Sequence, residues 1–286
     1  MHIEPLDGVT FGATVTDVVI ADLDPATWDE LYAAWLDHAL LIFPAQFVSK
    51  AVQNDFARRF GALEFAAAPI ANIDADGRLH SDRDDDVVKS IRGNEGWHHD
   101  STYMPVQAKG AVFSAEIVPG EGGATGWADM RAAYDALDDA TRQRLHGLRA
   151  KHSLHYSQGR AGYLPTRTND RGGYDQYGYH DLDTPIRPLT KVHPETGRTN
   201  LLIGRHAHDI EGLEPEESEM LLDELNEWAC QGERSYHHQW SVGDVVVWDN
   251  RRLMHQATPF DLTQPRRMWH TRIAGDPATE AADNHR

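Results

Sequence analysis

Strand-like patterns dominate the distribution of apolar residues along the chain. Apolar runs, or β-branched residues alternating with small ones, occupy residues 8–22, 38–43, 110–119, 122–129, 187–203, 245–248 and 266–273. Runs of this length and composition are typical of buried or half-buried strands. We therefore expect a fold built mainly from short strands, with a tight turn at Pro194–Gly197 in one hairpin.

Fewer segments have apolar residues at the spacing of an amphipathic helix. These segments are residues 27–37, 50–60, 129–137, 138–148 and 215–230. Many short strands with a few peripheral helices suit a double-sheet jelly roll of the cupin kind. The pattern alone establishes only a mixed fold of strands and helices. Since no repeat or linker interrupts the chain, we expect a single domain over residues 1–286.

Two stretches, residues 66–92 and 152–190, show neither the alternation of a strand nor the apolar spacing of an amphipathic helix. The first contains an acidic run and then the short apolar run 87–91, which we interpret as a strand. The second contains tyrosines among glycine, aspartate and arginine residues. Long irregular stretches in compact domains often serve as lids or binding loops, so both are predicted lid loops. For the acidic run, a solvated surface excursion is an equal alternative.

Composition and charge exclude several classes of protein. No apolar run approaches the roughly 20 residues of a membrane span, and the N-terminus lacks the features of a signal peptide. The one cysteine, Cys230, fits a reducing cytoplasm. A net charge of −18 argues against nucleic acid as a partner. Because the net charge is negative, a small anionic substrate would need local cationic side chains to bind. The oligomeric state stays open, and a homo-oligomer is possible.

A candidate metal site begins at Trp97-His98-His99-Asp100. Side chains alternate along an extended backbone, so His98 and Asp100 point the same way and His99 points the opposite way. His255, which follows the apolar strand 245–248, is the best third donor. Two histidines and one carboxylate form the facial triad of non-haem Fe(II) oxygenases. A rival pair with the same spacing is His206 and His208, but no acidic or arginine partners follow it at fitting positions.

Four motifs together carry a family resemblance. They are, in chain order, Trp97-His98-x-Asp100-Ser101-Thr102-Tyr103, Gly122-Gly123-x-Thr125, Gly243-Asp244 leading through Asp249-Asn250-Arg251 to His255, and Arg266. The set resembles the taurine dioxygenase/2,4-dichlorophenoxyacetate dioxygenase family of Fe(II)- and 2-oxoglutarate-dependent oxygenases. Further runs resemble its branch that acts on (S)-2-aryloxypropionates: residues 38–44, 100–106, 128–138 and 191–198.

The resemblance implies a double-stranded β-helix with the metal at its open end. It implies Fe(II) held by His98, Asp100 and His255, with 2-oxoglutarate as co-substrate and O2 as oxidant. The distal carboxylate of 2-oxoglutarate would then meet Arg266, helped by the Thr125 hydroxyl. Arg267 points to the other face of the expected strand, and the family's spacing from the last histidine ligand favours Arg266 over it.

Candidate substrate residues follow from the same comparison. Asn94 matches a substrate-contacting asparagine of taurine dioxygenase, and Tyr103 could line an aromatic pocket. Where taurine dioxygenase has an arginine for the sulfonate, this chain has His270, which argues against taurine. Arg272, two residues further, could hold a carboxylate instead. Two of these residues also have a structural alternative, which is turn formation for Asn94 and the core for Tyr103.

The leading functional hypothesis is a dioxygenase that hydroxylates a small carboxylate, an aryloxyalkanoate being favoured. Hydroxylation beside the ether oxygen would give a phenol and a 2-keto acid, while 2-oxoglutarate becomes succinate and CO2. A hydroxylase of N-acyl amino acids, or of another natural carboxylate, is the alternative within the class. A zinc hydrolase and a non-catalytic cupin-like binding protein are alternatives from other classes.

Overall fold

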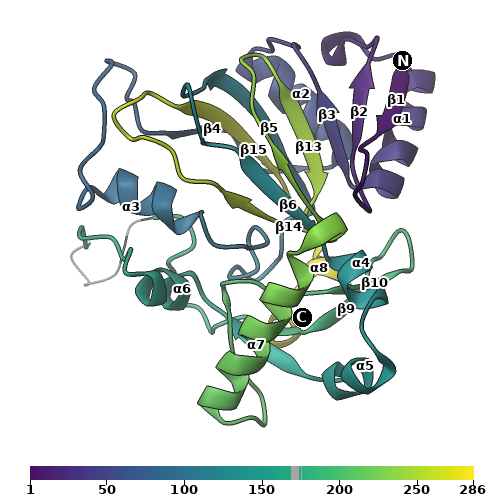
Figure 1. Cartoon of the computed structure of the whole chain (residues 1–286), viewed down its shortest axis with the longest axis vertical. Coiled ribbons are helices and arrows are strands. Elements are labelled where there is room, and N and C mark those ends of the chain that lie inside the picture. Colours follow the sequence, from purple (N-terminus) through teal and green to yellow (C-terminus); the bar gives the residue numbers. More distant parts are fainter. Residues whose placement is uncertain (169–173, 175) are drawn as a thin grey trace.

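A seven-stranded sheet is the largest element of the computed structural model, which describes residues 1–168, 174 and 176–286 (Figure 1). Its strands lie in the order β1 (His2–Pro5), β2 (Ala13–Thr16), β3 (Leu40–Phe43), β13 (Val245–Asp249), β5 (Gly110–Ile117), β15 (Arg267–Ile273) and β4 (Leu63–Ala71). Neighbouring strands are antiparallel except β2 and β3, which are parallel. The apolar residues of β3 and β13 are buried, as expected for central strands.

A smaller sheet packs against the larger one. Its strands lie in the order β12 (Ser235–His238), β6 (Thr125–Asp129) and β14 (Leu253–Ala257). Large apolar side chains from both sheets share one buried cluster, which includes Phe113, Trp127, Trp248, Leu253 and Met268. The Trp127 and Trp248 rings lie 5.8 Å apart. Two sheets that bury their inner faces against each other in this way form the predicted double-sheet architecture.

Helix α1 (Pro25–His38) packs against the large sheet at β3 and β13, and helix α2 (Lys50–Phe60) packs against it at β4, β5 and β15 (Figure 1). The Ser49 side chain caps α2 by accepting a hydrogen bond from the Val52 amide. Trp35 of α1 meets Phe60 of α2 edge to face, at 4.9 Å between ring centroids. This apolar layer fixes both helices on the face of the sheet away from the smaller sheet.

The remaining elements lie outside these two sheets, and most of them close the other end of the molecule (Figure 1). They are η1 (Ile20–Asp22), α3 (Asp86–Gly93), α4 (Met130–Asp135), α5 (Asp139–Leu145), β7 (Arg149–His152), α6 (Leu154–Ala161), β8 (Ile186–Pro188), β9 (Thr190–Val192), β10 (Thr199–Leu201), β11 (Ala207–Ile210), α7 (Pro215–Ala229), η2 (Gly232–Arg234), α8 (Pro277–Glu280) and η3 (Asp283–His285). Of the helices in the described ranges, none is both long and apolar enough to cross a membrane.

The expectation that residues 66–92 are irregular is wrong at both ends of this segment, and its role as a lid stays a prediction. Residues 66–71 belong to strand β4, which pairs with β15, and residues 87–91 lie in helix α3 rather than in a strand. The alanines of β4 carry little apolar bulk, so only pairing with β15 makes this segment a strand. In α3, Val88 and Ile91 are buried three residues apart, and Asp85 caps the Val87 amide at 2.8 Å.

The predicted lid over residues 152–190 contains regular structure at both ends. Helix α6 begins after Ser153, whose hydroxyl caps the Tyr156 amide at 3.1 Å, and β8 pairs with β7. Residues 169–173 and 175, near the middle of this predicted lid, lie outside the described residues. Whether the segment closes over a ligand stays a prediction.

Candidate active site

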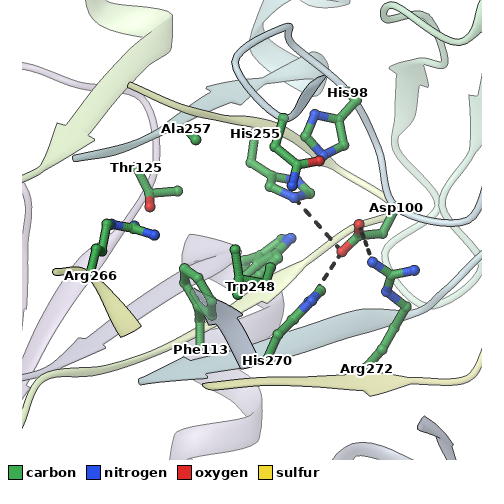
Figure 2. Close-up of a pocket in the computed structure, with 12 residues that line it drawn as sticks. His98, Asp100, Phe113, Thr125, Trp248, His255, Ala257, Arg266, His270 and Arg272 are labelled. Carbon is green, nitrogen blue, oxygen red and sulfur yellow. Dashed lines mark hydrogen bonds and ion pairs between the residues drawn. The ribbon is translucent and has the colours of Figure 1, made fainter. Parts of the chain in front are cut away.

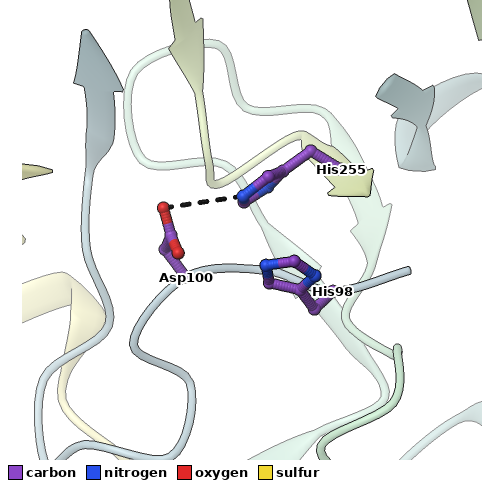
Figure 3. A group of neighbouring side chains, drawn as sticks. All are labelled: His98, Asp100 and His255. Carbon is purple, nitrogen blue, oxygen red and sulfur yellow. Dashed lines mark ion pairs between the residues drawn. The ribbon is translucent and has the colours of Figure 1, made fainter. Parts of the chain in front are cut away.

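His98, Asp100 and His255 lie together at one end of the small sheet (Figure 3). Their potential ligand atoms all lie within 4.8 Å of one another, and all three residues are buried. His255 lies on β14, and His98 lies beside it through a backbone bridge. The His98 amide donates to the His255 carbonyl at 2.9 Å, and the His255 amide donates to the His98 carbonyl at 2.8 Å. Residues 157 positions apart in sequence are thus fixed side by side.

Asn250 anchors the loop that carries Asp100. Its side-chain oxygen accepts from the Asp100 amide at 2.7 Å, and its side-chain nitrogen donates to the carbonyls of Asp100 and Ala108. His99 points away from the cluster, and its Nδ1 lies 2.7 Å from the Asn250 carbonyl. The sequence analysis missed Asn250, although it belongs to one of the quoted motifs, because its partners come from distant segments.

The electrostatics of the cluster favour two neutral rings and one anion. Burial lowers the pKa of His98 well below its ordinary value and lowers the pKa of His255 to about 4. Burial alone would raise the pKa of Asp100, but Arg272, His255 and His270 outweigh it and hold that pKa well below its ordinary value. The Asp100 carboxylate is therefore ionised at neutral pH.

The hydrogen bonds leave suitable lone pairs available for a metal. His98 Nδ1 lies 2.7 Å from the Gly96 carbonyl, so this nitrogen carries the proton and Nε2 is left as a ligand. Asp100 Oδ2 is buried and has no hydrogen-bond partner among the described residues. An orphaned carboxylate oxygen beside two neutral imidazoles fits a divalent cation, which would supply the missing partner.

A cavity beside this cluster brings Arg266 and Thr125 close to the same space (Figure 2). Arg266 is 4% exposed, and its guanidinium donates to the Gly123 carbonyl at 3.1 Å. It makes no ion pair within the described part of the chain, and burial lowers its pKa to about 10. A buried, uncompensated guanidinium favours an anionic ligand.

The Thr125 hydroxyl is available to the same ligand. Its oxygen accepts a hydrogen bond from Trp240 Nε1 at 2.9 Å, so its own proton can be donated elsewhere. Trp240 lies outside every motif quoted from the sequence. Its position could not be predicted, because it depends on the packing of residues 239–242 against Phe113.

Arg272 and His270 both lie against Asp100 (Figure 2). Arg272 Nη2 donates to Asp100 Oδ1 at 2.6 Å, and its Nη1 donates to the Ser101 hydroxyl at 3.1 Å. His270 Nε2 lies 3.4 Å from Asp100 Oδ2. Both residues line the cavity, but Asp100 balances the Arg272 charge, an ion pair that the sequence analysis did not anticipate.

Other predicted site residues take different positions around the cavities. Asn94 lines the cavity beside the cluster and also a larger one of about 930 Å³, which Tyr103 lines as well. His206 is buried and its Nδ1 lies 2.8 Å from the Ser157 hydroxyl, while His208 stacks on Tyr156. This rival histidine pair joins no group of three possible metal ligands in the described ranges.

Comparison with known proteins places this site among oxygenases. The model of the taurine catabolism dioxygenase TauD, TfdA family matches residues 2–273. An (S)-phenoxypropionate/alpha-ketoglutarate-dioxygenase of Sphingobium herbicidovorans is 61% identical over 99% of this chain and 98% of its own. A protein of the same name from Delftia acidovorans is 56% identical over 96% of each chain.

A solved structure supports the fold. The crystal structure of AAD-2 in complex with Mn(II) and N-oxalylglycine has a TM-score of 0.88 and 34% identity, and it covers 99% of both chains. An alpha-ketoglutarate-dependent 2,4-dichlorophenoxyacetate dioxygenase of Cupriavidus pinatubonensis is 35% identical over 90% of this chain and 92% of its own. The predicted double-stranded β-helix with peripheral helices is confirmed.

Proposed function

The chain belongs to the taurine catabolism dioxygenase TauD, TfdA family and is a 2-oxoglutarate-dependent dioxygenase, and from this premise we propose that it cleaves aryloxyalkanoates. The observation that carries the substrate class is the 61% and 56% identity to two (S)-phenoxypropionate dioxygenases over nearly the whole chain. The first of these matches extends over 99% of this chain, so it spans the segments around the cavity as well as the candidate metal-binding motifs.

We infer that His98, Asp100 and His255 hold the Fe(II) that this enzyme class requires. The orphaned Asp100 oxygen and the two neutral rings support this assignment. When bound, the iron with 2-oxoglutarate and O2 supplies the oxidant for hydroxylation. These three residues would hold the metal from one side and would leave room beside it for 2-oxoglutarate and O2.

Arg266 and Thr125 would bind the distal carboxylate of 2-oxoglutarate. The guanidinium offers a fork with matching geometry, and the threonine hydroxyl adds one donor. Burial of both side chains excludes water from the pair, which strengthens the interaction. Such a clamp orients the keto acid end of the molecule toward the metal.

The proposed reaction adds a hydroxyl group to the substrate carbon that lies between the ether oxygen and the carboxylate. One oxygen atom of O2 enters this product, and the other enters succinate as 2-oxoglutarate loses CO2. The hydroxylated carbon then releases the phenol and becomes the carbonyl carbon of a 2-keto acid. A 2-aryloxypropionate therefore gives a phenol and pyruvate.

The test is an assay of purified protein with Fe(II), ascorbate and 2-oxoglutarate on each enantiomer of a 2-aryloxypropionate. We expect phenol and succinate in equal amounts from the (S) enantiomer. Absence of phenol from both enantiomers would contradict the substrate class. An anaerobic visible absorption band on addition of Fe(II) and 2-oxoglutarate tests the cofactors separately.

N-acyl amino acids are the alternative substrates within the class, and the same succinate assay compares them directly. Membership of the family leaves the zinc hydrolase and the non-catalytic binding protein without support. In a zinc hydrolase, Arg266 and Thr125 would have no shared task.

A further inference from the structure

Arg205 is a half-buried arginine without an acidic partner in the described part of the chain. It lies in the turn between β10 and β11, where its amide donates to the Trp97 carbonyl at 2.8 Å. Its side chain donates to Gln158 Oε1 at 2.7 Å. No described carboxylate lies within ion-pair distance of it, unlike Arg272 beside Asp100. Burying an unpaired cation costs free energy, so such a group favours an anion.

Two glycines of the motif before the metal cluster make room for this pair. A Cβ on Gly93 would lie 2.3 Å from Gln158 Oε1, and a Cβ on Gly96 would lie 3.0 Å from Arg205 Cδ. Any side chain at either position would displace Gln158 or Arg205. The backbone that leads into His98 therefore accommodates the Arg205–Gln158 pair at close range.

Arg205 adjoins the larger cavity through Gln158, which lines that cavity together with Tyr103 and Tyr179. The larger cavity shares Asn94 and other lining residues with the cavity beside the metal cluster. Burial lowers the pKa of Arg205 to about 10, and the nearby phenols of Tyr103 and Tyr179 act in the opposite direction. Arg205 thus stays cationic at neutral pH. The Tyr179 hydroxyl is buried and has no partner among the described residues.

Buried arginines elsewhere already have their partners or a proposed ligand. Arg187 donates to the carbonyls of Thr102, Met104 and Glu280. Arg272 is balanced by Asp100, and Arg266 is proposed to hold 2-oxoglutarate. Arg205 has one neutral acceptor, so most of its hydrogen-bonding capacity is unused within the described residues.

We propose that Arg205 binds the carboxylate of the substrate, with Gln158 fixing the orientation of its guanidinium. The inference rests on the proposed function, because it assigns the group that recognises the anionic end of that substrate. It assigns a different arginine to each carboxylate of the reaction. Arg266 binds the distal carboxylate of 2-oxoglutarate, and Arg205 binds the carboxylate of the substrate. The aryl ring then occupies the larger cavity, which Tyr103 and Tyr179 line.

The test measures binding of (S)-2-phenoxypropionate to the anaerobic protein loaded with Fe(II) and 2-oxoglutarate, by calorimetry. We expect Arg205→Gln to raise the Kd of the acid about 10- to 100-fold, since a charged forked hydrogen bond is lost. The preference for the acid over its methyl ester should fall by the same factor. Arg205→Lys should recover part of the affinity, and the Kd of 2-oxoglutarate should stay within about twofold.

Arg198→Gln is the matched control, because Arg198 pairs with Asp135 on the surface and should leave both Kd values unchanged. A second variant, Gly96→Ala, keeps Arg205 but displaces its side chain. It should raise the Kd of the acid, while the protein should still unfold cooperatively on heating. Wild-type affinity for the acid in Arg205→Gln overturns this inference. A wild-type protein that binds the acid but releases no phenol contradicts the proposed reaction alone.

Discussion

At the scale of single residues, the two carboxylate oxygens of Asp100 face different groups. Oδ1 accepts from Arg272 at 2.6 Å, while Oδ2 lies 3.8 Å from His255 Nε2. Arg272 thereby orients the carboxylate that we propose as a metal ligand. Groups that orient metal ligands often matter nearly as much as the ligands themselves.

We expect Arg272→Gln to weaken metal binding about 10- to 100-fold, because Asp100 loses the cation that orients it. The Kd of Mn(II), measured by titration of the protein without iron, checks this. Arg267→Gln is the control on the same strand, since Arg267 points to the opposite face and pairs with Glu116. Equal Mn(II) affinity in the two variants would show that Arg272 does not position Asp100.

The metal cluster could be predicted from the sequence, whereas its surroundings could not. Alternation along an extended backbone correctly separates His99 from His98 and Asp100, because this rule is local. The ion pair of Arg272 with Asp100 joins residues 172 positions apart. No local pattern encodes such a contact, which depends on how β15 lies relative to the metal-binding loop.

At the scale of elements, one buried glutamine ties helix α2 to the large sheet. Gln53 Nε2 donates to the carbonyls of Val112 and Trp269 and to the Thr271 hydroxyl, and its Oε1 accepts from Ser114 at 2.5 Å. Gln53 is 1% exposed. It therefore joins α2 to β5 and β15, and β15 carries His270 and Arg272.

Replacing Gln53 with Leu should destabilise the protein by about 1–3 kcal/mol, because it leaves the Ser114 hydroxyl and neighbouring groups without a buried partner. Urea unfolding followed by tryptophan fluorescence measures this change. Gln143→Leu, at an exposed position of α5, should change the free energy of unfolding by less than about 0.5 kcal/mol. A comparable loss in both variants would contradict the role assigned to Gln53.

Element predictions succeeded where the local pattern matches the tertiary environment. The helices α1 and α2 bury apolar side chains as expected, and the continuous apolar run of β13 is buried on both faces. In α7, Leu221 and Leu225 are buried as expected, whereas Met220 is 63% exposed. Strand β4 was not predicted, because its alanines and proline do not favour a strand without the pairing with β15. Helix α3 was predicted as a strand, because its short apolar run is compatible with a helix or a strand.

At the scale of the whole molecule, buried ion pairs connect distant parts of the chain. Arg252 donates to Asp129 at 2.6 Å, and it also donates to the carbonyls of Asp37 and Thr10. Burial alone would raise the pKa of Asp129, but Arg252 outweighs it and lowers that pKa below its ordinary value. A depressed carboxyl pKa stabilises the folded state above the unfolded-state pKa.

We therefore expect the free energy of unfolding to stay steady above about pH 5 and to fall as the pH drops below about 4, the ordinary aspartate value. Urea unfolding at several pH values measures the slope. Asp129→Asn should be less stable at pH 7 and should lose stability less steeply in acid. A slope identical to that of the wild type would mean that other carboxylates control the acid transition.

The paired backbone amides of His98 and His255 have one last consequence. These two hydrogen bonds join backbone groups and not the imidazoles, so no side chain that would bind a metal takes part in them. We therefore expect the two segments to stay paired when the metal is removed. A chelator should remove the iron and leave the thermal unfolding transition cooperative. Manganese should then bind to the same site within the dead time of ordinary mixing.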